Sequence, residues 1–225
     1  MARAKSQFIC QQCGTSYQKW VGKCENCGEW NSLVEQLPVD MGASAVARSS
    51  GKGKALTTLR LSETAAETKQ ARLATGIADL DAVLGGGFLP GGVVLVAGQP
   101  GIGKSTLLAQ VAAFIARQNQ VLYISGEESI SQVKLRAERL GAVDSESLQL
   151  ASSNSAEDIA ASIQTSQYNL VIVDSIQTLS LAEIASAPGS VSQITNSSNV
   201  IIRAAKAANT AVILVGHVTK DGSIA

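Results

Sequence analysis

The chain has 225 residues, of which 45% are hydrophobic and 16% are charged. This composition excludes a disordered chain, and the length suits one α/β domain with a small appendage. The formal net charge is zero, but residues 1–72 carry ten basic against six acidic side chains, and residues 73–225 carry eight against twelve. The basic end favours a polyanionic partner or is a solvated tail, and charge alone does not decide between them.

Neither a membrane span nor a secretory signal is expected. No stretch reaches the ~18 consecutive apolar residues that a span needs. The first seven residues are polar and basic, with no apolar region after them. We therefore expect a cytoplasmic protein, in which cysteines are more often metal ligands or catalytic groups than disulfides.

All four cysteines lie near the N-terminus, as Cys10-x2-Cys13 and Cys24-x2-Cys27. Four thiolates in two such pairs suit tetrahedral Zn²⁺, and because protein fills all four positions the site is predicted to be structural. The interval between the pairs is shorter than in the common four-cysteine template, and a redox CxxC is the main alternative. A module of ~30 residues has too small a core to fold without such a metal.

The sequence predicts three segments: a zinc ribbon over 1–36, a flexible linker over 37–57 and an ATPase core over 58–225. The linker is small, polar and without apolar periodicity. The ribbon binds either nucleic acid or protein. Lys19, Trp20 and Lys23 interleave charge with an aromatic ring, which suits stacking on bases or a small packed cluster with solvated lysines.

From residue 58 onward, strand-like and helix-like patterns alternate. Ser155 is a predicted helix N-cap, and Gly141 suits the end of the preceding helix. The alternation predicts an α/β fold with a mostly parallel sheet covered on both faces. The predicted strands are 93–97, 121–125, 148–150, 170–173 and 211–215, and helices are predicted over 104–117, 130–140, from 155, and over 191–208.

A phosphate-binding loop stands between the first of these strands and the first helix. Gly98-Gln99-Pro100-Gly101-Ile102-Gly103-Lys104-Ser105 matches GxxxxGK[ST] in full. Glycines let backbone N–H groups curl around a phosphate, and the helix adds its own N-terminal donors and dipole. Lys104 is predicted to bind the β- and γ-phosphates of ATP and Ser105 to ligate Mg²⁺, with Thr106 beside them. The alternative, a glycine-rich turn that binds nothing, does not explain the full match.

Three further residues follow predicted strands. Asp174 ends the strand 170–173 and is expected to hold Mg²⁺, usually through water. Glu127 and Glu128 follow the strand 121–125, and Glu127 is favoured over Glu128 as the base that activates water. Two surface acids at a helix start are the alternative. His217, the one histidine, either senses the γ-phosphate or is structural.

Taken together, these residues resemble the bacterial RadA/Sms family of DNA repair ATPases over essentially the whole chain. The resemblance rests on the two cysteine knuckles, the P-loop and five further stretches. These are Thr75-Gly76-Ile77 through Leu80-Asp81 with Leu84-Gly85-Gly86-Gly87, Ile124-Ser125-Gly126-Glu127-Glu128-Ser129, Val173-Asp174-Ser175-Ile176-Gln177-Thr178, Ala187-Pro188-Gly189-Ser190-Val191-Ser192-Gln193 and Gly216-His217-Val218-Thr219-Lys220.

The resemblance implies a RecA-like core and a DNA-dependent ATPase of recombinational repair. Such a motor is similar to ring helicases, processes branched recombination intermediates and promotes branch migration with the RecA recombinase on single-stranded DNA. The full-length form is expected to be a hexameric ring. By similarity, residues 187–193 and the stretch after Thr219 would face the bore of that ring.

Two departures from the family pattern change what is expected. Ile194-Thr195-Asn196 stands where family members usually have an Arg-Glu pair, which weakens the case for a DNA contact there. The chain also ends at Ala225, before the further core strands, the Lys-Asn-Arg-Phe-Gly motif and the Lon-protease-like domain of the family. We therefore expect it to bind ATP but to hydrolyse it slowly.

Two other functions are compatible with the same residues. A signalling ATPase or phosphotransferase of the KaiC type shares the RecA core and the paired glutamates, although the zinc ribbon argues against it. A nucleotide-gated adaptor that only binds partners is the second alternative. Stimulation of ATP hydrolysis by single-stranded DNA separates the motor from the KaiC type, and replacement of Lys104 separates it from the adaptor.

Overall fold

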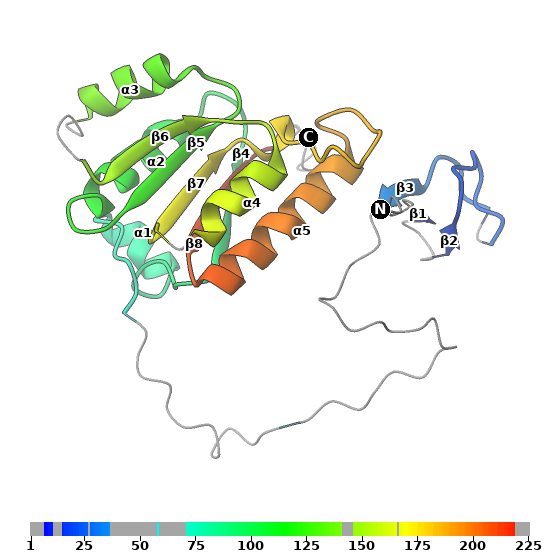
Figure 1. Ribbon diagram of the computed structural model, residues 1–225, viewed down its shortest axis with the longest axis horizontal. Helices are drawn as coiled ribbons and strands as arrows, with labels where there is room; N and C mark the ends of the chain where they lie inside the picture. Colours follow the sequence, from blue (N-terminus) through cyan, green and yellow to red (C-terminus); the bar gives the residue numbers. More distant parts are fainter. Residues whose placement is uncertain are drawn as a thin grey trace.

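The computed structural model describes residues 7–10, 15–26, 28–36, 58, 71–140, 146–165 and 167–218. These residues form a small antiparallel sheet near the N-terminus and a larger parallel sheet with helices on both faces (Figure 1). The predicted linker 37–57, the predicted stop at Gly141 and the stretch after Thr219 lie outside the described residues, as do Cys13 and Cys27. The proposed division into three segments stays a prediction.

The large sheet has five strands, and every neighbouring pair is parallel, as predicted. Their carboxyl ends therefore meet at one edge, where Gly98 lies opposite His217 and Ser125 opposite Asp174. In spatial order the strands are β4 (Val93–Gly98), β8 (Ala211–His217), β7 (Leu170–Asp174), β5 (Val121–Ser125) and β6 (Leu148–Ser152). The three central strands, β8, β7 and β5, are mostly apolar and buried on both faces, whereas the edge strands β4 and β6 are only partly buried.

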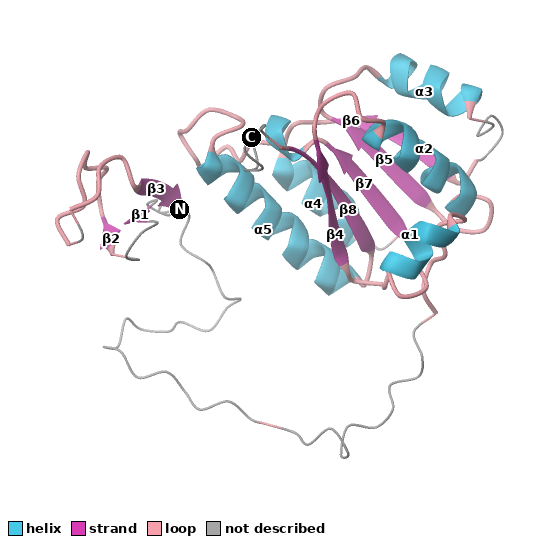
Figure 2. Ribbon diagram, turned by 180° about the vertical axis from the view of Figure 1, so that it is seen from behind, coloured by secondary structure: helices cyan, strands magenta, loops and turns pink. Residues whose placement is uncertain are grey.

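Helices cover the two faces of this sheet and bury a separate apolar cluster on each (Figure 2). One face carries α1 (Ala78–Val83), α2 (Lys104–Ile115) and α3 (Ile130–Arg139). The other carries α4 (Ala156–Gln164) and α5 (Val191–Ala208). Among the described residues, no helix combines the length and apolar character that crossing a membrane requires.

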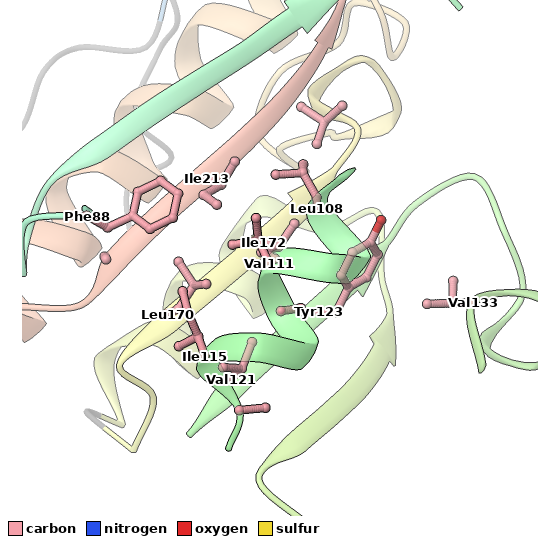
Figure 3. Close-up of a cluster of buried hydrophobic side chains, with 14 residues drawn as sticks. Phe88, Leu108, Val111, Ile115, Val121, Tyr123, Val133, Leu170, Ile172 and Ile213 are labelled. Carbon is pink, nitrogen blue, oxygen red and sulfur yellow. The ribbon is translucent and has the colours of Figure 1, made fainter. Parts of the chain in front are cut away.

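Successive residues along a strand point alternately into the apolar cluster on one face of the sheet and the cluster on the other. On the α2 face, Leu108 and Val111 pack with Ile172 and Ile213 of the sheet (Figure 3). Burial of such side chains contributes about 1.5–3 kcal/mol each. The core is thus held by apolar contacts that continue up to the edge where the strands end.

Local signals fix where the helices begin. The Ser155 side chain accepts a hydrogen bond from the Asp158 N–H, which confirms the predicted N-cap. Ser129 forms a capping box with Gln132 at the start of α3. The short helix α1 and the 3-10 turn η1 (Ile176–Thr178) were not predicted, because each is shorter than two helical turns and shows no periodic pattern.

The N-terminal sheet consists of β1 (Gln7–Cys10), β2 (Ser16–Tyr17) and β3 (Leu33–Gln36) in the order β2-β1-β3. It contacts the core through the end of β3. The main-chain oxygen of Glu35 accepts hydrogen bonds from Ser192 and, at 3.4 Å, from Asn196 Nδ2 of α5. Asn196 is thus turned toward the ribbon backbone.

Candidate nucleotide-binding and metal-binding sites

The predicted phosphate-binding loop joins the end of β4 to the start of α2. Gly101 and Gly103 have φ angles of +79° and +100°, which favour glycine. A Cβ at either position would meet nothing within 4 Å, so the backbone conformation, not crowding, requires glycine there. The loop leaves the first N–H groups of α2 available to an anion.

Lys104 is buried in this loop, at 8% exposure, with its charge surrounded by acceptors. Its ammonium donates to the carbonyl oxygens of Gly98 at 2.8 Å and Gln99 at 2.9 Å. It also lies 3.3 Å from His217 Nδ1. Because an ammonium group can only donate, Nδ1 is the acceptor and the proton of a neutral imidazole is on Nε2.

Glu127 joins the same cluster from the loop after β5. Its Oε1 accepts a hydrogen bond from Ser175 Oγ at 2.6 Å and lies 3.2 Å from His217 Nε2. Lys104, His217, Glu127 and Ser175 therefore form one connected network built from four separate parts of the chain. Ser175, which had no predicted role of its own, donates directly to the carboxylate of Glu127.

The neighbouring Glu128 has a different environment. Its Oε1 pairs with Arg136 Nη2 of α3 at 2.5 Å. This bond is the first cause that raises the pKa of the Arg136 guanidinium above its ordinary value. The structure thus separates the two glutamates, with Glu127 at the P-loop network and Glu128 in an ion pair with α3, and the role of Glu127 as a base stays a prediction.

Asp174 is the last residue of β7 and is 8% exposed. Its Oδ2 accepts a hydrogen bond from the buried Tyr123 hydroxyl at 2.7 Å. Together with the Ser105 hydroxyl it offers the oxygen ligands that Mg²⁺ prefers, so these residues fit the predicted ion. Tyr123 was not identified from the sequence as a site residue, because a tyrosine within an apolar strand is indistinguishable from an ordinary core residue.

The predicted bore loop 187–193 is partly helical. Ser190 caps α5, so Val191–Gln193 form its first turn. Gln193 is 1% exposed, accepts the Leu181 N–H at 2.9 Å and donates to the Ile184 and Ser186 carbonyls. Its side chain therefore braces residues 181–186, and the exposed residues of the stretch 187–193 are Ala187, Pro188 and Val191.

In the ribbon, the described metal-ligand candidates are Cys10 and Cys24, both almost fully buried. Cys10 Sγ lies 3.2 Å from Ser32 Oγ, and Cys24 Sγ lies 3.3 Å from the Tyr17 hydroxyl. This bond to Cys24 is the first cause that raises the pKa of Tyr17. Hydroxyl donors beside buried sulfur fit thiolate ligands, although no group of three ligands falls within the described residues.

The two tryptophans lie on the ribbon surface. Trp20 is 54% exposed and Trp30 is 67% exposed, and both rings lie beside Gly22. The Lys23 ammonium lies 5.6 Å from the centre of the Trp30 ring. The described rings are thus open to solvent instead of packed into a core.

The parallel sheet, the P-loop and the acidic residues at the strand ends define a P-loop ATPase domain of RecA-like fold with an N-terminal metal ribbon. The chain belongs to the AAA domain family, whose model matches residues 58–223. Residues 8–35 match a rubredoxin metal binding domain.

Matches over the whole of this chain to curated relatives bear out the expected resemblance to the RadA family. The chain is 46% identical to DNA repair protein RadA of Brucella abortus and 45% identical to that of Bacillus subtilis. It is 41% identical to DNA repair protein RadA of Escherichia coli. Each match covers all of this chain but 49–50% of the relative, so the chain spans about half the length of these relatives.

A solved structure supports the fold at much lower identity. The structure described as a DnaB-like replicative helicase and its interactions with primase has a TM-score of 0.58 and 14% identity. The match covers 69% of this chain and 45% of that chain. This likeness concerns the RecA-like fold alone.

Proposed function

We propose that this chain is the ATPase part of a DNA repair motor that binds ATP with Mg²⁺ and hydrolyses it in response to single-stranded DNA. The observation that carries the proposal is the network that joins the P-loop lysine to Glu127 through His217. The shared RadA family supports the DNA substrate, since the relatives are named DNA repair proteins.

In this proposal each residue of the network has one task. Residues 98–106 bind the phosphates, and Lys104 moves from its loop carbonyls to the β- and γ-phosphates. Ser105 and Asp174 hold Mg²⁺, which neutralises phosphate charge when it is bound. Glu127, held by Ser175, orients and deprotonates the attacking water. His217 loses its contact with Lys104 and so reports the arrival of the γ-phosphate to the following loop.

The remaining expectations concern a protein of the length of the curated relatives. We infer that the motor acts on branched recombination intermediates, promotes branch migration with the RecA recombinase and assembles as a hexameric ring. Cys10, Cys13, Cys24 and Cys27 would hold one structural Zn²⁺ in the ribbon. The chain alone is expected to turn ATP over slowly.

Two measurements test this function. ATP hydrolysis should rise when single-stranded DNA is added, and no rise would favour a DNA-independent ATPase of the KaiC type. Filter binding to single-stranded DNA should weaken steeply between about 50 and 200 mM salt, because phosphate contacts release counterions. ATP with Mg²⁺ should change this affinity, since the network senses the γ-phosphate. If retention of DNA did not depend on salt, the result would contradict a motor that binds DNA through its backbone phosphates.

A further inference from the structure

A tyrosine hydroxyl lies inside the core directly behind the predicted Mg²⁺ carboxylate. Tyr123 is in the middle of β5 and is 2% exposed. Its ring packs in the cluster that contains Leu108 and Val111 of α2 (Figure 3). A phenylalanine would fill nearly the same volume, so packing alone does not call for a hydroxyl at this position.

The hydroxyl is paired with Asp174. Strands β5 and β7 are neighbours, with Tyr123 opposite Ile172 and Ser125 opposite Asp174. The tyrosine side chain reaches along the strand and donates to Asp174 Oδ2 at 2.7 Å. This bond offsets the cost of burying the phenol and also fixes one of the two carboxylate oxygens.

The phenol hydroxyl is the donor of this bond and Asp174 Oδ2 is the acceptor. Arg136 of α3 adds a positive charge that acts on both Tyr123 and Asp174. Asp174 Oδ2 therefore accepts from a buried hydroxyl, and the cation that acts on both residues is itself held by Glu128.

We propose that Tyr123 is the positioning residue for the Mg²⁺-binding carboxylate of the nucleotide site. The inference rests on the proposed ATPase function and adds a residue to it. By holding Oδ2, Tyr123 stops the carboxylate from rotating and leaves Oδ1 for the ion or one of its waters. Partners of this kind, one step behind a ligand, typically change metal affinity about 10- to 100-fold when they are removed.

The test is Tyr123→Phe, measured by binding of a fluorescent ADP over a range of Mg²⁺ concentrations. Affinity without Mg²⁺ should stay within about twofold of wild type, because the P-loop is intact. The Mg²⁺ concentration that gives half of the gain in affinity should rise about tenfold. Mn²⁺, which binds the same ligands more tightly than Mg²⁺, should restore part of the loss.

Tyr168→Phe is the matched control. Its hydroxyl donates to Gln149 at 2.8 Å, away from Asp174, so the same chemical change should leave the Mg²⁺ dependence unaltered. In an Asp174→Asn background, Tyr123→Phe should have almost no further effect, because the two residues act as one unit. An additive effect in that double variant would overturn the proposal.

The outcomes separate this inference from the function on which it rests. If wild type shows no Mg²⁺-dependent nucleotide binding, the proposed ATPase function fails. If wild type shows it and Tyr123→Phe has an unchanged Mg²⁺ midpoint, only the role of Tyr123 fails.

A measurement on the wild-type sequence removes the risk that Tyr123→Phe does not fold. The chain has three tyrosines and can be labelled with fluorotyrosine. At saturating ADP, addition of Mg²⁺ should shift the ¹⁹F signal of Tyr123 and leave those of Tyr17 and Tyr168 in place. A Tyr123 signal that ignores Mg²⁺ would count against the proposal.

Discussion

The ribbon and the ATPase core are stabilised by different means. The core buries two large apolar clusters, one on each face of its sheet. The described ribbon buries three residues, of which two are the cysteines Cys10 and Cys24 and one is Leu33. Its tryptophans, the largest apolar side chains it has, lie in solvent.

This difference in stabilisation indicates where the functional residues of each part lie. The core has enough buried area to fold by itself, so its polar residues are available to form a site at the sheet edge. The described part of the ribbon has too small an apolar core for this, so we expect a metal ion bound by its cysteines to stabilise it, and its tryptophan rings lie on the surface. Changes to one part should therefore leave the other largely intact.

The largest effect is expected from Lys104→Ala. Loss of the P-loop cation should lower ATP turnover about a hundredfold or more and abolish tight nucleotide binding. Zinc content and the fold of the ribbon should not change, which metal analysis and calorimetry on the same sample would check. If DNA-dependent function survives this substitution, the chain works as an adaptor and the motor proposal is wrong.

Glu127→Gln should separate binding from hydrolysis within the core. Gln keeps the size and the contact with Ser175 but cannot take a proton, so turnover should fall about 10²- to 10⁴-fold. Nucleotide affinity should stay near wild type. Glu128→Gln is the matched control and should cost far less turnover, because Glu128 pairs with Arg136. Equal losses from both variants would show that Glu127 has no special role.

Cys24→Ser should damage the ribbon alone. Serine is a poor zinc ligand, so bound zinc should be lost and the ribbon should unfold, as it should on chelation. The thermal transition of the core and its Mg²⁺-dependent nucleotide binding should persist. Cooperative loss of both transitions would show instead that the Glu35 contacts with Ser192 and Asn196 make one folding unit.

The smallest expected effect is a change in tryptophan fluorescence. The chain has two tryptophans, Trp20 and Trp30, and both lie in the ribbon. Tryptophan fluorescence therefore reports on the ribbon without contribution from the core. Bases stacked on these exposed rings should quench it when oligo(dT) is added, and an abasic oligonucleotide should not. DNA binding seen by filter retention without quenching would place the DNA contact on the core.

The sequence by itself determined the local elements and the chemistry within short motifs. Continuous apolar runs gave β5 at its observed bounds, and helical spacing gave α5 at Val191–Ala208. The P-loop and the cysteine pairs were readable because all of their residues lie within a few positions of one another. Such features depend on backbone propensities and burial patterns that short stretches carry themselves.

Only the tertiary structure decided which of these pieces meet. The crossovers place β8 between β4 and β7, and this order brings His217 to Lys104, 113 positions away in the chain. It brings Glu127 to Ser175, 48 positions away, whereas the adjacent and chemically identical Glu128 pairs with Arg136, only 8 positions away. It also gives Asp174 the hydroxyl of Tyr123. Strand order and register are set by packing over the whole sheet, so no local pattern could have specified the contacts of Lys104 with His217, Glu127 with Ser175 or Tyr123 with Asp174.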